Sequence, residues 1–435
     1  MMKAETERRG PMDNRAIIQR SLDYIEKNLQ TDITAAELAQ AAGFSLFHYY
    51  RLFQQATGLP VMQYILRRRL LHGVYAMNRG ERKLDAALAY GFDTYPGFYK
   101  AFCREFGSTP TEFLEANRAR RPYRIDITRE EHMTITHKKA AQILENWNLG
   151  HESITDIYCE STGARQPNAF YVGESHVLKC TINLGKLKKQ IEVTTAIESI
   201  GLLADTPIKT ADGRDYVREG ELYFCLTKRL PGKQLVSHRF GDGDGRFVGE
   251  IIGQLHLALA KIEDCVSEAD LLSTLRDWAM PKAKEALGLS EDFCRSYLAT
   301  FSDLHPQLPR QIVHRDPNPG NIICADDRWG FIDFELAERN ARIYDPCYAA
   351  TAVLSETFDG NNEGWLQIYR DILWGYDSAA HLTDAERKAV PYVILANQFV
   401  CVAWFAEQEQ YLELFETNKR MTKWLLERFN ALCEL

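Results

Sequence analysis

Several hallmarks of membrane, secreted and metal-binding proteins are missing from this sequence. Its ten cysteines form no CxxC pair and no cluster with histidine, which gives a zinc site little support. The most apolar stretch, residues 390–406, is interrupted by Asn397 and Gln398 and indicates a core helix rather than a membrane span. The N-terminus has no apolar signal region. We therefore expect a cytoplasmic protein whose scattered cysteines are small buried apolar residues.

The chain does contain a marked division of charge. Residues 1–124 hold 19 Lys and Arg against 13 Asp and Glu, whereas residues 125–435 hold 33 against 47. A basic first part suits a polyanionic partner, and an acidic remainder argues against nucleic acid wrapping there. The acidity also aids solubility. The length of 435 residues predicts about two or three domains.

Hydrophobic spacing changes along the chain and predicts a multidomain protein. Residues 1–118 contain apolar residues at helical spacing and predict an all-α domain. Residues 119–136 are charged, contain a proline and are interpreted as a linker. Within 137–435, strand-like runs come first and helices dominate after about 246. This order predicts an α+β domain with a small sheet lobe, 150–230, and a larger helical lobe, 231–435.

The helical domain contains a duplication. Residues 34–64 and 83–113 both read as a helix, Gly-Phe, a polar residue, a second helix, then Gly and Pro before an aromatic residue. Gly43 and Gly91 can adopt the positive φ of a tight turn between two helices. Ser45 and Thr94 can cap the second helix of each pair. The duplication therefore predicts two helix-turn-helix units.

The second helix of each unit has one apolar face and one outward face. On the first of these helices the predicted core side chains are Leu46, Tyr49, Leu52 and Phe53. The outward face, which we expect in a DNA major groove, holds Phe47, Tyr50, Arg51 and Gln54. The corresponding outward residues of the second unit are Tyr95, Pro96, Gly97, Tyr99 and Lys100. Contacts to DNA phosphates are expected from Arg67, Arg68, Arg69 and Lys83.

Residues 14–118 resemble the DNA-binding domain of the AraC/XylS regulator family, and the closing stretch 91–113 carries the best match. The resemblance implies that both units dock in successive major grooves on one face of double-stranded DNA, joined by a helix at about 61–78. Pro96 and Gly97 depart from the longer polar residues of the family. The alternative is a helical bundle with incidental surface arginines. The sequence leaves monomer and dimer open.

The second part of the chain carries the residues that phosphoryl transfer requires. Asp316 is followed by Asn321 five residues later, and Asp333 ends an apolar strand-like run, 329–333. An Asp at the first position can orient an acceptor hydroxyl, while the Asn and the second Asp can hold Mg²⁺ against phosphates. Lys179 lies in a strand and is expected to reach those phosphates. Its partner is predicted to be Glu192, with Glu198 as the weaker choice.

Residues 138–435 resemble the aminoglycoside phosphotransferase and choline kinase-like superfamily, which is related to protein kinases. The resemblance rests on 313–321, 331–337, 344–350 and 249–259. It implies ATP and Mg²⁺ as cofactors. It places Asp316 as the catalytic base, with His314 in the same loop and Asp345 as a support for that loop. It also implies Asn321 and Asp333 as Mg²⁺ ligands, with Glu335 near the metal, and an adenine hinge from Cys225 to Lys228.

Two departures from this family stand out. Arg315 occupies a position where these small-molecule kinases usually have glycine, although protein kinases carry arginine there. The phosphate-covering loop, 161–168, contains only Gly163 and is no GxGxxG motif, so Ser161 and backbone amides are expected to bind the phosphates. The acceptor is open. Acidic residues after Trp404 suit a cationic small molecule, and a solvated acidic helix is the alternative: Glu407, Glu409, Glu413 and Glu416.

Three functional interpretations follow. In the first, the protein is a DNA-binding transcriptional regulator whose effector domain is an active small-molecule phosphotransferase. In the second, the same regulator binds nucleotide or ligand but turns over little. In the third, the protein is mainly a small-molecule kinase, and the helical domain makes protein contacts. The intact set of Asp316, Asn321, Asp333 and Lys179 favours the first interpretation over the second.

Overall fold

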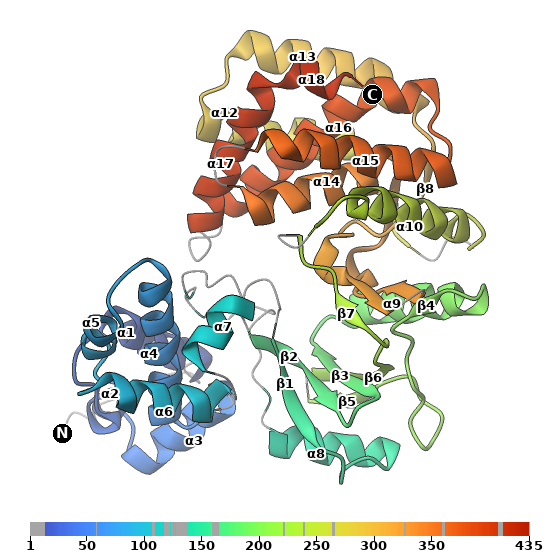
Figure 1. Ribbon diagram of the computed structural model, residues 1–435. Coiled ribbons are helices and arrows are strands. Elements are labelled where there is room, and N and C mark those ends of the chain that lie inside the picture. The colour runs from blue at the N-terminus through green and yellow to red at the C-terminus, as the bar shows by residue number, and fades with distance from the viewer. Residues whose placement is uncertain are drawn as a thin grey trace, which may run out of the picture. The chain divides into compact units, whose positions relative to one another are not determined.

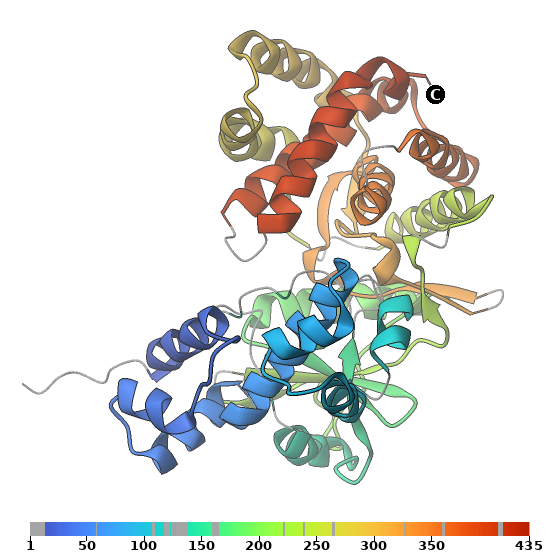
Figure 2. The ribbon, with the colours of Figure 1, turned by 60° about the vertical axis from the view of Figure 1, so that its left-hand side comes forward.

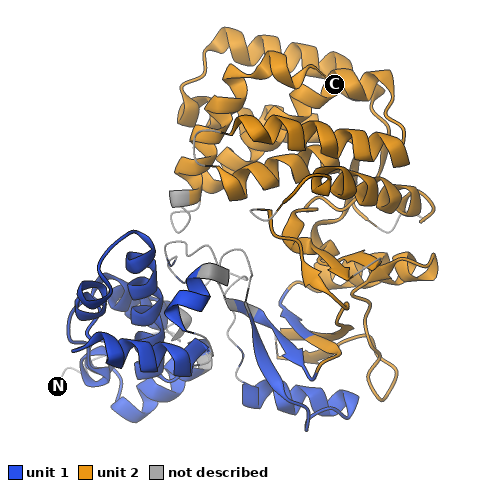
Figure 3. Cartoon of the chain, viewed as in Figure 1, with its two compact units in different colours: residues 1–173, 178–182 blue, residues 174–177, 183–435 orange. Residues whose placement is uncertain are grey.

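The computed structural model of this protein describes most of the chain from Asn14 to Glu434. Outside the described residues lie 1–13, 58, 107–108, 117–121, 123–124, 126, 128–134, 136, 159–164, 221, 238–239, 263–265, 326–327, 359–361, 408–411 and 435. The chain divides into two compact units, which are described separately (Figure 3). Unit 1 comprises residues 1–173 and 178–182, and unit 2 comprises 174–177 and 183–435. The division passes through one strand, so the predicted domain limits at 118, 136 and 150 stay predictions.

Unit 1 begins with a bundle of helices, coloured blue to cyan in Figures 1 and 2. Its members are α1 (Asn14–Lys27), α2 (Ala35–Ala41), α3 (Leu46–Thr57), α4 (Val61–Asn78), α5 (Lys83–Ala89), α6 (Tyr95–Phe106) and α7 (Pro110–Ala116). Two apolar clusters hold the bundle together. One lies among α1 to α4 and the other among α4 to α7. Helix α4 contributes to both clusters and so joins the two halves.

Local signals define both helix-turn-helix units as the sequence predicts. Gly43 has φ of 72° and Gly91 has φ of 81°, and this left-handed conformation reverses the chain between helices. The Ser45 hydroxyl accepts the His48 N–H at 3.4 Å, and the Thr94 hydroxyl accepts the Gly97 N–H at 3.2 Å. The predicted turns and caps are therefore confirmed.

Part of the segment interpreted as a linker packs on the helical bundle. Ile127 is buried in the cluster of α1 to α4. Gln19 of α1 donates to the Ile125 carbonyl at 2.9 Å and accepts the Ile127 N–H at 2.7 Å. These bonds tie this stretch to α1. The arginines of the predicted linker lie outside the described residues: Arg118, Arg120, Arg121 and Arg124.

The remainder of unit 1 is a helix and strands that follow this segment. They are α8 (His137–Leu144), a 3₁₀ turn (Glu145–Trp147), β1 (Ile154–Tyr158), β2 (Arg165–Val172) and most of β3 (His176–Thr181). Strands β1 and β2 pair antiparallel, with Asp156 opposite Phe170, and the register shifts between Asp156 and Tyr158. Strand β3 lies next to β2 in the same sheet.

Unit 2 contains small sheets and a large helical lobe (Figure 1). Its strands are β4 (Leu203–Ala204), β5 (Val217–Glu219), β6 (Leu222–Lys228), β7 (Lys233–Gln234), β8 (Arg310–Val313), β9 (Ile322–Ala325), β10 (Arg328–Phe331) and β11 (Glu338–Ala341). Strands β5 and β6 pair antiparallel, β4-β10-β9-β7 form one sheet, and β8 pairs antiparallel with β11. The short β8–β11 pair brackets the segment that carries the predicted catalytic residues.

The helices of unit 2 supply most of its core. They are α9 (Leu184–Ser199), α10 (Asp244–Leu259), α11 (Leu271–Thr274), a π-helical turn (Leu275–Ala279), α12 (Met280–Leu287), α13 (Glu291–Leu304), α14 (Tyr344–Thr357), α15 (Glu363–Ala379), α16 (Asp384–Ala406), α17 (Leu412–Glu427) and α18 (Phe429–Leu432). Short 3₁₀ turns lie at η5 (His305–Gln307), η6 (Pro319–Asn321) and η7 (Phe334–Leu336). Among the described residues, α16 alone is long and apolar enough to span a membrane, and 67% of its most apolar window is buried in the protein. This burial fits the predicted core helix.

Helices α10 and α15 cross with their backbones in contact. A Cβ placed on Gly249 of α10 would lie 1.8 Å from the Ile372 carbonyl oxygen, and one on Gly375 of α15 would lie 2.0 Å from the Arg246 carbonyl oxygen. Only glycine fits at such a crossing. The close approach places the C-terminal half of α10 against the start of α14, where the candidate site begins.

Candidate functional site

The candidate active site is built on the loop that follows β8. The Asp345 carboxylate, in the first turn of α14, accepts the backbone N–H of His314 at 2.7 Å and that of Arg315 at 3.0 Å. Asp345 is completely buried. A buried carboxylate that accepts two successive backbone amides fixes the path of the loop at the residue before Asp316. This arrangement fits the supporting role predicted for Asp345.

A histidine that the sequence reasoning did not select holds Asp345 in turn. His256 of α10 lies 2.9 Å from Asp345 through Nε2 and 2.8 Å from the Tyr376 hydroxyl through Nδ1. Burial by itself raises the pKa of Asp345, but the hydrogen bond from His256 and the nearby charges outweigh it, and the net pKa lies below the ordinary value. The only sequence signal for His256 was its place in the apolar stretch 249–259.

His314 connects the loop to the segment that follows β10 by hydrogen bonds to both. It is fully buried, its Nε2 lies 3.0 Å from the Ile332 carbonyl oxygen, and its Nδ1 accepts the Asp316 N–H at 3.3 Å. Its ring packs 4.4 Å from that of Phe334, measured between centroids. His314 therefore connects the loop to the segment at Ile332 and Phe334, and its ring is buried.

Asp316 is held by two amide side chains. Asn318 donates to Oδ1 at 2.8 Å, and Asn321 donates to Oδ2 at 3.2 Å and to the backbone oxygen at 2.9 Å. Burial raises the pKa of Asp316, and the nearby charge of Asp333 raises it further, while the Asn318 bond opposes both. A fixed carboxylate with a raised pKa is suited to accept a proton from a hydroxyl group.

The second predicted acid, Asp333, lies at the start of η7 with φ of 70°, a left-handed conformation that is uncommon for a residue with a side chain. The backbone N–H of Ile332 donates to the Asn321 carbonyl at 3.0 Å and joins this segment to the catalytic loop. Glu335 of η7 pairs with Lys186 of α9 at 3.7 Å. The structure thus brings Asp316, Asn321 and Asp333 close together, whereas the Glu335 carboxylate forms an ion pair with Lys186.

The donor atoms present fit a magnesium ion that arrives with phosphates. The Asn321 amide nitrogen donates to Asp316, which leaves its Oδ1 as a candidate ligand for a cation, and the charge of Asp333 acts on the same Asp316 carboxyl. Among the residues that the structure describes, no group of three or more His, Cys, Asp or Glu could hold a metal by itself. Mg²⁺ typically binds one or two protein oxygens and completes its shell with phosphates and water. The two-residue donor set therefore fits Mg²⁺ bound with a nucleotide.

The predicted nucleotide-binding residues are only partly placed. Lys179 lies half-buried in β3, and its neighbours Leu178 and Cys180 are buried, so Lys179 points to the opposite face of the strand. Glu192 lies on the exposed side of α9. Lys179 and Glu192 belong to different units, and their pairing stays a prediction. Ser161 and Gly163 lie outside the described residues.

The predicted hinge residues lie on β6. Cys225 is buried, and its thiol lies 3.5 Å from the Asp215 carbonyl oxygen. Lys228, at the end of the strand, forms an ion pair with Glu198 of α9. The hydrogen bond from Lys228 lowers the pKa of Glu198, whose modest burial opposes the effect. Glu198 is the residue that the sequence analysis named as the weaker candidate partner of Lys179.

Helix α3 is the second helix of the first helix-turn-helix unit, and most of its predicted outward face is accessible. Phe47 is 82% exposed, and Arg51 and Gln54 are exposed as well. Tyr50 is half-buried against the core of α1 to α4. The predicted core position of Leu46 is wrong, because Leu46 is the first residue of α3 and 47% of its surface remains exposed. The other three predicted core residues, Tyr49, Leu52 and Phe53, are buried as expected.

On helix α6, the second helix of the second unit, the predicted outward positions are exposed except for Tyr95, which packs against the cluster of α4 to α7. Lys100 and Tyr99 are exposed, whereas Phe98 and Phe102 are fully buried. Tyr95 is half-buried, with the Lys83 ammonium 5.7 Å from its ring centroid. The exposed polar side chains of this helix include those of Tyr99, Lys100 and Arg104.

The three consecutive arginines of α4 do not lie where a phosphate contact requires. Arg68 is buried and makes a two-pronged bond to Glu26 of α1, at 2.5 and 2.8 Å. Arg67 is buried beside Glu105, and Arg69 donates to the carbonyls of Leu29 and Thr31. The predicted phosphate contact of Arg68 is therefore corrected to an internal ion pair, because α4 is the central helix of the bundle and its charged groups face neighbouring helices.

The acidic residues near the end of the chain give no support to an acidic pocket for a cationic acceptor. Glu407 forms an ion pair with Lys282, and Glu416 pairs with Lys419 at 3.0 Å. Glu409 and the side chain of Glu413 lie outside the described residues. Lysine-paired acids on an accessible surface are the arrangement expected of a solvated helix face.

Comparisons with known proteins agree with both halves of the chain. A family model described as the phosphotransferase enzyme family matches residues 182–382, and one described as a helix-turn-helix domain matches residues 16–116. The transcriptional regulator Rob of Salmonella typhimurium is 30% identical over 155 residues, which are 34% of this chain and 54% of Rob. The chain thus spans about half the length of that relative.

Shorter relatives and a solved structure extend these matches. The transcriptional activator AarP of Providencia stuartii is 32% identical over 97 residues, 22% of this chain and 72% of AarP. A microcompartment-associated aminopropanol kinase shares the fold, with a TM-score of 0.51 and 15% identity over 67% of this chain and 97% of that kinase. The helical half therefore has relatives among transcription regulators, and the fold of the second half is kinase-like.

Proposed function

Since the chain belongs to the AraC-type helix-turn-helix regulators and joins to that domain a kinase-like domain of the phosphotransferase enzyme family, we propose that the two parts act together. The protein is a sequence-specific, DNA-binding transcriptional regulator of the cytoplasm. Its second domain transfers the γ-phosphate of Mg-ATP to a hydroxyl group of a small molecule. The regulator thereby carries its own sensor for that molecule.

The observation that carries the phosphotransferase proposal is the arrangement around Asp316. Its carboxylate is oriented by Asn318 and Asn321, has a raised pKa and lies in a loop fixed by Asp345. Asp316 would orient the acceptor hydroxyl and receive its proton, and Asn321 and Asp333 would hold the magnesium ion. That ion, when bound, supplies charge neutralisation for the phosphates. Positioning of this kind is most of what phosphoryl transfer asks of a protein.

The DNA-binding proposal is supported by two accessible helices, α3 and α6. The exposed Arg51 and Gln54 of α3 can donate to base edges, and Arg can hold guanine with two parallel bonds. Lys100 of α6 can reach a phosphate or a base. Because Arg67, Arg68 and Arg69 face inward, the phosphate contacts are assigned to exposed lysines and arginines such as Lys83 and Lys100 instead.

One observation favours the second candidate, a regulator that binds nucleotide but turns over little. Glu192 lies on the exposed side of α9, which is not the position expected of a residue that orients a phosphate-binding lysine. The third candidate, a kinase with a helical domain used for protein contacts, has less support because the outward faces of α3 and α6 are rich in groups that contact DNA.

One preparation of the full chain can separate these candidates. Selection from random DNA followed by gel shift tests for a preferred sequence, and ATP consumption tests for turnover with candidate hydroxyl-bearing amines and aminocyclitols. A selected site together with acceptor-stimulated ATP consumption is the expected result. A selected site with Mg-ATP binding but no turnover would establish the second candidate, and turnover without any preferred DNA would establish the third. A thermal-shift screen of ligands, with and without Mg-ATP, would identify the acceptor class.

A further inference from the structure

The catalytic loop is clamped from the side by an arginine next to the catalytic aspartate. Arg315 reaches across to Glu338 of β11, and its guanidinium lies over the ring of Tyr344 of α14. We propose that Arg315, through Glu338 and Tyr344, is a positioning residue that sets the place of Asp316. This inference rests on the proposed phosphoryl transfer, because it assigns to Arg315 a part in that reaction.

The backbone of Arg315 is in a conformation that needs support from its surroundings. Its φ is 74°, in the left-handed region that residues with a Cβ rarely adopt. The family that this domain resembles usually has glycine here, which adopts such a φ freely. Asp345 accepts the N–H groups of both His314 and Arg315 and so imposes the turn. A side chain retained at such a position points to a role that offsets the steric cost.

The side chain of Arg315 is largely buried and contacts specific partners. Its Nε lies 2.6 Å from Oε1 of Glu338, and the two side chains are only 21% and 16% exposed. The guanidinium carbon lies 4.2 Å from the centroid of the Tyr344 ring. Asn340 also donates to Oε1 of Glu338 at 2.8 Å. In a largely buried place such charged bonds are strong and directional, so they can fix the neighbouring backbone.

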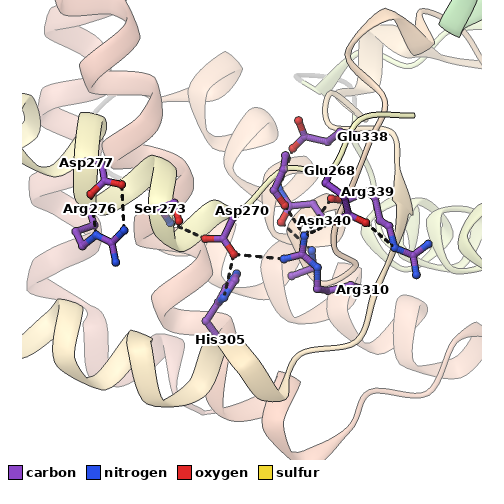
Figure 4. A network of polar contacts seen from close by, with 12 residues as sticks. Glu268, Asp270, Ser273, Arg276, Asp277, His305, Arg310, Glu338, Arg339 and Asn340 are labelled. Carbon is purple, nitrogen blue, oxygen red and sulfur yellow. Dashed lines mark hydrogen bonds and ion pairs between the residues drawn. The ribbon is translucent and has the colours of Figure 1, made fainter. Parts of the chain in front are cut away.

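Glu338 is itself attached to a rigid frame. Strand β11 pairs with β8, and Glu338 lies opposite Val313, two residues before Arg315. The next residue, Arg339, pairs with Glu268 at 3.2 Å, and Arg310 of β8 pairs with the same Glu268 at 2.9 Å. Figure 4 shows this network, in which Arg310 also approaches Asp270 at 3.5 Å. The anchor for the clamp is therefore a strand held by its own separate ion pairs.

The clamp, which consists of the Arg315–Glu338 ion pair and the contact of Arg315 with Tyr344, acts on Asp316 through the backbone. The Asp316 carboxylate itself is held by Asn318 and Asn321. The Arg315 side chain is bonded to Glu338 of β11, and the backbone N–H of Arg315 donates to Asp345. Asp316 follows directly, so the direction of its Cα–Cβ bond depends on both. Loss of the clamp should leave nucleotide binding in place and misplace the base, which lowers the rate of the chemical step.

The test compares Arg315→Lys and Glu338→Gln with Arg276→Lys, which changes the exposed ion pair between Arg276 and Asp277. The first two variants keep size but lose the planar fork or the charge of the clamp. The control makes the same Arg-to-Lys change in the neighbouring network of Figure 4. We expect kcat to fall about ten- to hundredfold in both clamp variants, with the KM and binding of Mg-ATP within about threefold of the original protein. Arg276→Lys should keep kcat.

A fourth variant separates positioning from general stability. Arg315→Gly relieves the left-handed conformation, which should offset part of the stability lost with the Glu338 ion pair, yet it should lose kcat to a similar degree when assayed well below its melting temperature. The double variant Arg315→Lys with Glu338→Gln should lose little more than either single variant, because both remove one clamp. Full kcat in Arg315→Gly, or an equal loss in Arg276→Lys, would overturn the proposal.

The proposal can be tested even if the chain shows no turnover, a result that would count against the proposed function. Hydrogen exchange of the amides of residues 313–318 then replaces kcat as the measurement. The clamp variants should speed exchange there by about tenfold or more while other core helices stay protected. Unchanged exchange in this segment would overturn the positioning role, whereas faster exchange throughout unit 2 would show a general loss of stability and overturn it equally.

Discussion

The carboxylate of Asp345 accepts the backbone N–H of His314 at 2.7 Å, and through this bond the helical lobe of unit 2 fixes the catalytic loop. The bond joins residues 31 positions apart in the sequence, and neither side chain needs to touch a substrate. The position of the loop that carries Asp316 therefore depends on the start of α14, on the buried His256 that contacts Asp345 and on the turn at Arg315.

Replacement of Asp316 by Asn should abolish phosphoryl transfer and spare nucleotide binding, because it removes the proton acceptor and leaves the metal ligands in place. Asp333→Ala should lose Mg-dependent nucleotide binding as well. Isothermal titration with a non-hydrolysable ATP analogue, with and without Mg²⁺, distinguishes the two variants. Undiminished Mg-dependent binding by Asp333→Ala would refute the metal assignment.

The rate of transfer should rise with pH through the pKa of Asp316. A general base works when it is deprotonated, and burial raises the pKa of this carboxyl above the ordinary value for Asp of about 3.9. The acid limb of the kcat profile should therefore lie above that ordinary value. An acid limb at or below the ordinary value for Asp would show that Asp316 is not the group that titrates.

Asp345 should contribute stability that persists well into acid. Its folded-state pKa is lowered, so the contribution is fully present above the unfolded pKa of about 3.9 and is lost as pH falls through the folded pKa. Asp345→Asn should lower the free energy of unfolding by about 3 to 5 kcal/mol near pH 7, because it breaks a buried hydrogen-bonded pair with His256. Urea unfolding at several pH values measures both effects.

A matched control for Asp345 is Asp377, a partly exposed carboxylate that accepts the Leu382 N–H at 2.7 Å and pairs with Arg387. Asp377→Asn should cost clearly less than Asp345→Asn because solvent screens its ion pair. Equal losses in the two variants would mean that the pair with His256 adds nothing specific.

Arg51→Ala and Arg68→Ala make the same change on two helices and should have different consequences. Arg51 is exposed on α3, and its loss should weaken binding to a selected DNA site by about 1–3 kcal/mol and relax the choice of base at one position. Arg68→Ala leaves Glu26 buried without its guanidinium and should lower stability by about 3 to 5 kcal/mol. Gel shifts and melting curves on both variants separate the effects. A normal melting temperature for Arg68→Ala would contradict its structural role.

Nucleotide and DNA should influence each other's binding. In unit 1, the buried Arg67 of α4 pairs with Glu105 of α6 at 3.0 Å and with Asp156 of β1 at 3.8 Å, which connects the helix-turn-helix bundle to the strands that follow it. We expect Mg-ATP plus ligand to change operator affinity by several-fold, and operator DNA to change ligand affinity by the same factor, a coupling of about 1–3 kcal/mol.

Titration of labelled operator DNA, with and without saturating Mg-ATP and ligand, measures this coupling. Asp156→Asn should reduce it, whereas Asp85→Asn, which removes an exposed carboxylate paired with Arg82, should leave it unchanged. Identical titration curves for the original protein, also at low salt where charge effects are strongest, would show two independent domains on one chain.

The sequence was most informative where structure depends on neighbouring residues. The positive φ of Gly43 and Gly91 and the capping bonds of Ser45 and Thr94 are local properties, and each was predictable from two or three adjacent residues. The spacing of Asp316, Asn321 and Asp333 was equally informative, because the loop and the strands β9 and β10 bring these residues together over a short span.

Long-range contacts account for what the sequence did not reveal. Arg68 looked like a surface arginine because its partner Glu26 lies 42 residues away on α1. His256 was one residue in an apolar helical pattern, and its role depends on Asp345, which lies 89 residues further along the chain. Glu198 pairs with Lys228, a contact that the sequence did not indicate. Periodicity shows which face of a helix is polar but not which distant charge that face will meet.

The glycine crossing of α10 and α15 has a mechanical consequence for the catalytic loop. At Gly249 and Gly375 the two backbones touch, so no layer of rotatable side chains separates the helices and absorbs their relative motion. Tyr376 directly follows this crossing on α15, and His256 lies two helical turns beyond it on α10. We therefore expect the two helices to move together as one rigid body. The amplitude of the motion of the loop at Asp316 should then depend on the motion of these helices more than on the flexibility of the loop itself.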